Sequence, residues 1–87
     1  MKIFHGIPTN VYVDLEVMSD KDGNLRPLTL IWRNGSRYNI DKVYSVVPSG
    51  LPQGGEALCY ECRIKGKRRD LYLQNGQWFV IIDKEML

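Results

Sequence analysis

The feature that most constrains this chain is a series of short segments with alternating apolar side chains, separated by tight turns that contain glycine. In the first such segment, Val11, Val13, Leu15 and Val17 alternate with Tyr12, Asp14, Glu16 and Met18. A period of two is typical of strands that bury one face, and no window shows the 3.6-residue period of an amphipathic helix. The pattern therefore predicts an all-β protein.

The turns divide the chain into six expected strands. We place these strands at residues 11–18, 28–32, 38–47, 57–65, 68–74 and 77–82. The segment 48–55 contains two prolines and three glycines, so it is predicted to be the longest loop and the segment least expected to be ordered.

The length of 87 residues suffices for one compact core. We therefore expect a single domain over residues 1–87, and the strand pattern divides it into three parts. These parts are an N-terminal arm at 1–10, a β-barrel at 11–82 and a C-terminal tail at 83–87.

The connection between the fourth and fifth strands is interpreted as a two-residue loop at Gly66-Lys67. Glycine at the first central position suits a type II′ turn. This register places Arg63 opposite Asp70, as a cross-strand charge pair, and Cys62 opposite Leu71.

The connection between the fifth and sixth strands is interpreted as a type I′ loop at Asn75-Gly76. It places Leu73 opposite Trp78, and Leu71 opposite Val80. Both turns independently put Leu71 and Leu73 on the core face, because residues directly opposite each other share a face.

The Asn34-Gly35 turn requires a different length. A two-residue loop would separate Trp32 from Tyr38, whereas a three-residue loop pairs Trp32 with Ser36 and brings Tyr38 opposite Leu30. We therefore predict a type I turn with Gly35 in the left-handed region, forming a G1 bulge.

Six hairpin-connected strands cannot bury one flat face in so short a chain. Curling into a closed barrel solves this problem and removes the free edges. The expected fold class is thus all-β, a small single-domain barrel of about six antiparallel strands and SH3-like, with a two-layer β-sandwich as the alternative.

The residues offer little for catalysis, metal binding or cofactor binding. His5 is the one histidine, and Cys59 and Cys62 have C-x-x-C spacing inside a strand, where they point to opposite faces. We expect Cys62 to be buried and Cys59 to face outward, and we expect no enzyme activity, no cofactor and no metal site.

Five basic residues lie within seven positions near Gly66, although the net charge is only +2. A solvated hairpin tip is the simplest interpretation, and a nucleic-acid-binding barrel is the alternative. The residues expected to contact phosphate in that alternative are Arg33, Arg37, Arg63, Lys65, Lys67 and Arg68.

An apolar patch is expected on the outer face of the sheet, where Tyr72 lies opposite Phe79 and beside Ile81. Such a patch is usually covered by a terminus or by a partner. The terminal arm or tail is one candidate cover. The other is a protein partner or a second copy of the chain, which makes the domain a non-enzymatic protein-interaction module acting through Tyr72, Phe79 and Ile81.

The chain has no apolar run of membrane-spanning length, and its N-terminus lacks the apolar region of a signal peptide. Two cysteines do not make a disulfide framework. We therefore expect a cytoplasmic protein without a membrane association.

A Trp–turn–Tyr hairpin at residues 30–43, followed by Cys62-Arg63-Ile64, Leu71-Tyr72-Leu73 and Trp78-Phe79-Val80, resembles a group of short uncharacterised bacterial proteins, mainly from Gram-positive species. To a lesser degree it resembles a short domain found with mutagenesis proteins related to error-prone polymerases. The resemblance covers residues 28–82. It implies a small β domain of unknown function and supplies no catalytic residues.

Overall fold

The computed structural model of the chain describes residues 7–83. Six strands and no helix occur in this range, as the alternating pattern predicts. The strands are β1 (Pro8–Ser19), β2 (Leu25–Ile31), β3 (Arg37–Gly50), β4 (Glu56–Ile64), β5 (Lys67–Gln74) and β6 (Gln77–Asp83). This part of the chain accordingly has no helical segment that could cross a membrane.

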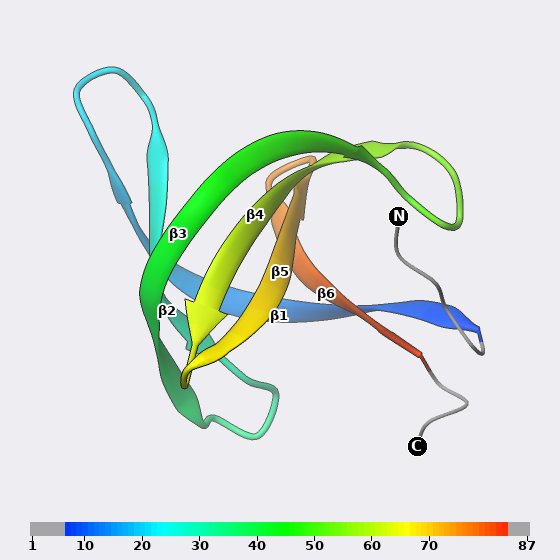
Figure 1. Ribbon diagram of the computed structural model, residues 1–87, viewed down its shortest axis with the longest axis horizontal. Helices are drawn as coiled ribbons and strands as arrows, with labels where there is room; N and C mark the ends of the chain where they lie inside the picture. Colours follow the sequence, from blue (N-terminus) through cyan, green and yellow to red (C-terminus); the bar gives the residue numbers. More distant parts are fainter. Residues whose placement is uncertain (1–6, 84–87) are drawn as a thin grey trace.

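The strands form a closed antiparallel barrel in the order β1-β2-β3-β4-β5-β6 (Figure 1). Pairing of β1 with β6, from Pro8 opposite Asp83 to Val13 opposite Trp78, closes the cylinder. The expected SH3-like barrel is therefore confirmed, and the sandwich alternative is not the architecture. Because β1 begins at Pro8, residues 8–10 belong to the barrel and not to an arm; residues 1–6 and 84–87 lie outside the described range.

The Asn34-Gly35 turn has the predicted three-residue form. The Gly35 N–H donates to the Trp32 carbonyl at 2.8 Å, and the Trp32 N–H donates to the Ser36 carbonyl at 2.8 Å. Gly35 has a φ of +87°, and Leu30 lies opposite Tyr38. The bulge therefore brings Trp32 and Tyr38 to the inside of the barrel.

The β4–β5 connection differs from the predicted one. The two turn residues are Lys65 and Gly66, with φ values of +53° and +73°, which indicates a type I′ turn. Arg63 consequently lies opposite Arg68, and the predicted Arg63–Asp70 pair is wrong. The shift in register is two residues, so every side chain keeps its predicted face.

The segment 48–55 is not the long loop that its composition suggests. Strand β3 continues to Gly50, and a short turn follows in which the Leu51 N–H donates to the Gly55 carbonyl at 2.9 Å. The Gln53 side chain donates to the Pro8 carbonyl at 2.6 Å, which attaches this turn to the start of β1.

Apolar side chains pack on both sides of the barrel wall. The inner core fills the barrel, and its buried members are Val13, Leu30, Tyr60, Cys62, Ile64 and Leu71. The outer cluster lies on the opposite face of β4, β5 and β6, and comprises Ala57, Cys59, Tyr72 and Phe79, with Leu51 and Ile81 packed against them. The wall is thus buried on both faces where the outer cluster covers it.

Candidate binding site between β5 and β6

The candidate site lies where β5 and β6, which a tight turn connects, separate from each other. The Asn75-Gly76 turn is type I′, as predicted, with Leu73 opposite Trp78 and Gln74 opposite Gln77. The β5–β6 ladder ends at the next pair, Tyr72 with Phe79, one residue short of the predicted Leu71–Val80 pair. Figure 1 shows β5 and β6 meeting at this turn and then separating.

A physical reason for the early end lies in the residues that further pairing would bring together. Continuing the register would place Arg69 opposite Ile82 on the inner face of the barrel. Burying a guanidinium against aliphatic side chains without a partner costs several kcal/mol. The two strands instead separate, β5 remaining paired with β4 and β6 with β1.

The separation creates a cavity of about 860 Å³, which we call the β5–β6 opening. Its size is within the range of ligand-binding pockets. The barrel interior supplies an apolar lining from Leu30, Trp32, Tyr38, Ile64 and Leu71. The lining also includes consecutive residues of both strands, 67–71 and 80–82, irrespective of the face on which they lie. Strand edges therefore border the cavity.

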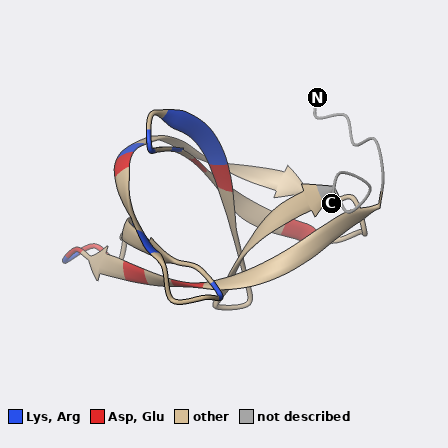
Figure 2. Cartoon of the chain, turned by 90° about the horizontal axis from the view of Figure 1, so that it is seen from below, with Lys and Arg blue, Asp and Glu red and all other residues tan. Residues whose placement is uncertain are grey.

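A basic rim surrounds one side of the β5–β6 opening. It consists of Lys65, Lys67, Arg68 and Arg69, all exposed and all lining the cavity, together with the half-buried Asp70. Figure 2 shows Lys and Arg gathered where β4 turns into β5. These four cations meet Asp70, Glu61, which is paired with Arg68, and Asp41, which accepts from the Gly66 N–H at 3.5 Å, so this end of the barrel has a small positive balance.

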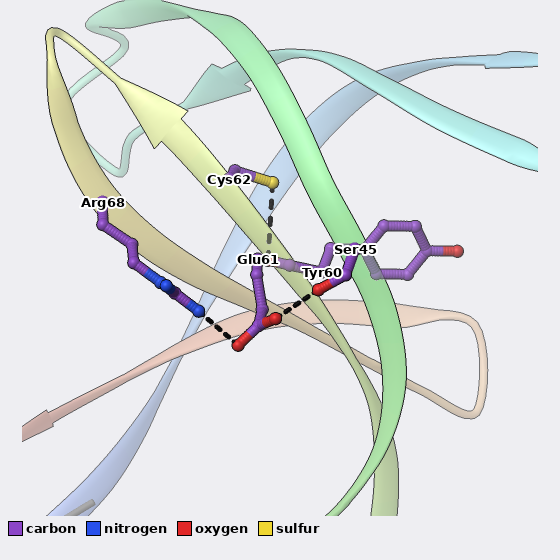
Figure 3. A network of polar contacts seen from close by, with 5 residues as sticks. All are labelled: Ser45, Tyr60, Glu61, Cys62 and Arg68. Carbon is purple, nitrogen blue, oxygen red and sulfur yellow. Dashed lines mark hydrogen bonds and ion pairs between the residues drawn. The ribbon is translucent and has the colours of Figure 1, made fainter.

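Two of the basic residues predicted to contact nucleic acid are already held in ion pairs with carboxylates of the same chain. Arg68 donates to Glu61 at 2.5 Å, and Ser45 donates to the other oxygen of the same carboxylate, so Glu61 connects β3 to β5 (Figure 3). Arg37 forms an ion pair with Glu16 at 2.6 Å, which lowers the pKa of that carboxyl group.

The other residues predicted to contact nucleic acid lie in different parts of the barrel. The Lys65 ammonium lies 4.8 Å from the centre of the Tyr38 ring, over its face, in a cation–π contact. Arg33 is exposed in the β2–β3 turn, and Arg63 is exposed on the outer face of β4. Of the six residues, Lys65, Lys67 and Arg68 line the β5–β6 opening, whereas Arg33, Arg37 and Arg63 do not.

The predicted protein-binding face is covered within the chain. Tyr72 and Phe79 lie opposite each other and stack at 5.5 Å, as the register predicts, but only 4% and 0% of their surface is exposed. The prediction of an exposed aromatic pair is therefore wrong. Leu51 packs against the cluster, and the Tyr12 ring contacts Phe79 at 5.5 Å, while Ile81 is half-buried and also lines the opening.

Both cysteines are buried thiols on opposite faces of β4. Cys62 belongs to the inner core, and burial raises the pKa of its thiol to about 11, with a smaller contribution from Asp70. Cys59 lies on the outer face, as predicted, but it is buried there within the outer cluster. No group of three or more metal-ligating side chains occurs among the residues that the structure describes.

The residues that sequence analysis missed are Trp32, Tyr38 and Arg69, which line the β5–β6 opening together. Their faces were predicted correctly, but their participation in a cavity depends on where the β5–β6 ladder ends. One signal was present in the sequence, since Arg69 falls on the core face next to Leu71. A charge at a core-facing strand position indicates that the barrel is open there.

Comparison with protein-family models, curated proteins and solved structures gives no match to this sequence.

Proposed function

We propose that this protein is a non-enzymatic protein-interaction module that binds an acidic, partly apolar segment of a partner at the β5–β6 opening. The observation that carries the proposal is an apolar cavity of about 860 Å³ with a rim of four basic side chains. Apolar side chains of the partner fill the cavity, and its carboxylates face the rim. The combination supplies both desolvation and charge complementarity.

The proposed interaction site differs from the outer face at Tyr72 and Phe79 that the sequence predicts. Phe79 is fully buried and Tyr72 nearly so, so a partner cannot contact either ring without displacing Leu51. Ile81 remains part of the site, because it also lines the β5–β6 opening.

The test is a selection of random peptides of about ten residues, displayed on phage, against the purified wild-type protein. A second selection uses the double variant Lys67→Glu, Arg69→Glu, which reverses two exposed rim charges. The matched control is Lys21→Glu, Arg26→Glu, which makes the same charge change at exposed positions of the β1–β2 hairpin.

We expect peptides rich in Asp, Glu and apolar residues to be enriched by the wild type and by the control variant. The selected peptides should bind the rim variant at least about tenfold more weakly, since rim charges speed association and hold the complex. Failure to enrich any peptide, or equal binding by the rim variant, contradicts the proposal. Circular dichroism verifies that both variants keep the β-sheet spectrum.

A nucleic-acid-binding barrel is the second candidate, favoured by the presence of Trp32 and Tyr38 beside the basic rim. Single-stranded nucleic acid is bound by aromatic stacking within a basic groove. The face of Tyr38 is occupied by Lys65, however, and Arg68 and Arg37 are paired with carboxylates. Fluorescence anisotropy with labelled oligothymidylate at about 50 mM salt tests this candidate, and binding that weakens steeply with added salt supports it.

A cytoplasmic location is also part of the proposal. Its support is that Cys59 and Cys62 are both thiols, held on opposite faces of one strand, which fits a reducing compartment.

A further inference from the structure

The charged residues that line the β5–β6 opening all come from one short segment of the chain. They are Lys65, Lys67, Arg68, Arg69 and Asp70, in the β4–β5 turn and the first residues of β5. The other lining residues that the structure describes are aliphatic or aromatic. The cavity therefore has one charged side, and the rest of its lining is apolar.

Two of the cations lie on the inner face of the barrel. Lys67 is opposite Ile64, and Arg69 is opposite Cys62, and both of these β4 residues belong to the inner core. Since opposite residues share a face and side chains alternate along a strand, Lys67, Arg69 and Leu71 form one inward-facing row. Both cations are exposed, and neither forms an ion pair within residues 7–83. The row thus changes from positive charge near the turn to buried core at Leu71.

The carboxylates at this end of the barrel are not on the inner face of β5. Asp70 borders the cavity, but it lies opposite Glu61 on the outer face, where Glu61 pairs with Arg68. Asp41 accepts from the N–H of Gly66 in the turn and does not line the cavity. The negative charges that offset the rim therefore lie away from the two inward cations.

The inner end of the cavity is closed by the core. Leu30, Ile64 and Leu71 line the cavity and are buried members of the inner core, and the half-buried rings of Trp32 and Tyr38 complete the lining beside them. A polypeptide backbone at this depth would carry N–H and C=O groups away from water without partners, which costs free energy. A hydrocarbon chain carries no such groups, so it fits the inner part of the cavity.

We propose that the β5–β6 opening binds a fatty acid, with its hydrocarbon tail in the apolar depth of the cavity and its carboxylate at Lys67 and Arg69. One charged side and one apolar interior match a ligand with a single anionic head and a single tail. The volume of about 860 Å³ is typical of small-molecule sites. A guanidinium offers two parallel N–H donors to a carboxylate, and the lysine adds a second positive charge.

This inference goes beyond the proposed function, because the ligand is a small molecule and its binding requires no partner protein. A fatty acid and an acidic protein segment fill the same cavity, so the protein holds one of them at a time.

The first experiment measures the binding of hexanoate, octanoate, decanoate and dodecanoate to the full wild-type chain by isothermal titration calorimetry, below their micelle-forming concentrations. Each CH₂ group that enters the cavity should strengthen binding about fourfold until the cavity is filled. Decyltrimethylammonium has the same tail length as a control but a cationic head. It should bind at least about tenfold more weakly than decanoate, because Lys67 and Arg69 repel it.

The second experiment removes the two inward charges with the double variant Lys67→Gln, Arg69→Gln. The matched control Lys21→Gln, Arg26→Gln makes the same change at exposed positions of the β1–β2 hairpin. Decanoate should bind the first variant at least about tenfold more weakly and the control about as well as the wild type. The uncharged ligand 1-decanol should bind all three proteins alike, which verifies that the variants keep the cavity.

NMR of the wild-type protein locates the ligand without any substitution. Trp32 lines the cavity and Trp78 does not, and these are the two tryptophans of the chain. Saturation with decanoate should shift the indole N–H signal of Trp32 much more than that of Trp78.

The outcomes separate the fatty-acid site from the proposed function. An affinity that does not rise with chain length, or equal binding of decanoate by the Lys67→Gln, Arg69→Gln variant and the wild type, overturns the site. Either result leaves the interaction module in place, because peptide selection tests it separately. If no peptide is selected but decanoate binds with the expected dependence on tail length and on the two cations, the proposed function fails and the fatty-acid site is supported.

Discussion

The two halves of β5 have opposite environments within eight residues of one strand. Its second half, residues 72–74, is paired with β6 throughout and with β4 at Tyr72 and Leu73, and Tyr72 belongs to the outer cluster. Its first half, residues 67–71, is paired on one side, carries three consecutive basic residues and borders a cavity. The difference shows that a closed barrel in this chain does not require every strand to be paired along its full length.

The charge distribution explains how the first half is tolerated. An exposed strand edge can pair with another copy of the chain and lead to aggregation, and lysine and arginine side chains at the edge oppose such pairing. Lys67, Arg68 and Arg69 supply these charges. In the proposed function the same three side chains also select an acidic segment as a partner, so protection of the edge and specificity have one physical origin.

The largest expected effect contrasts one substitution in each environment. Phe79→Ala should destabilise the fold by about 3–5 kcal/mol, because the ring is fully buried beside Tyr72 and its removal leaves a cavity. Arg69→Ala, at the exposed rim, should change the free energy of unfolding by less than about 0.5 kcal/mol. Urea unfolding at 25 °C measures both, and similar losses for the two variants would remove the distinction between the halves.

The second effect is a loss of stability at high pH. The pKa of the Cys62 thiol is raised from 9.0 to about 11 by burial, and burial also raises the pKa of Tyr60. A group with a raised pKa in the folded state is fully stabilising below its unfolded pKa. Stability should therefore decrease between about pH 9 and pH 11, by on the order of 2 kcal/mol.

The pH effect is checked by urea unfolding at a series of pH values, for the wild type and for Cys62→Ala. The variant is less stable throughout, because it loses buried volume, but its stability should depend less on pH in this range. An equally steep decrease in the variant would show that Cys62 is not the titrating group.

The sequence predicts the barrel and the face of the sheet on which most side chains lie, because two of its turns use residues suited to their conformation. Asn at the first position of Asn75-Gly76 tolerates a φ of +53°, and Gly35 adopts a φ of +87°. The β4–β5 turn is ambiguous for a specific reason. Gly66 suits the first position of a type II′ turn and the second position of a type I′ turn. The two registers differ by two residues, so the core pattern is satisfied by both.

Two features of the site do not follow from the strand pattern, although Arg69 on the core face gives a sign of the second one. The cover over Tyr72 and Phe79 includes Leu51, which lies in a segment whose prolines and glycines suggest a loop. The β5–β6 opening depends on where the ladder ends, and the stagger of strands around a closed barrel determines that point. Neither the cover nor the stagger can be derived from alternation within one strand.

A third prediction concerns the turn from which β5 starts. Gly66→Ala should cost about 1 kcal/mol, because position 66 has a φ of +73°, where an L side chain is strained. Lys65→Asn should stabilise the fold by a few tenths of a kcal/mol, since asparagine tolerates its φ of +53° better. Thermal unfolding measures both shifts. A stabilising effect of Gly66→Ala would contradict the type I′ assignment.

The smallest expected effect comes from Glu61 of β4, which connects the two neighbouring strands, β3 and β5. Glu61→Gln should reduce stability by about 0.5 kcal/mol, because it weakens the contacts with Ser45 and Arg68 at a partly exposed position. About 1 M salt should reduce the difference between variant and wild type. A loss of several kcal/mol would indicate that the network is a structural element of the barrel wall.

The central claim is that the β5–β6 ladder ends at Tyr72 and Phe79, and amide hydrogen exchange followed by NMR tests it without any ligand. In the purified wild-type protein, the amides of Tyr72 and Phe79 should exchange at least about a hundredfold more slowly than those of Arg68 and Ile81. Equal protection of all four amides would show that β5 and β6 are paired along their length, which contradicts the open edge and the binding site derived from it.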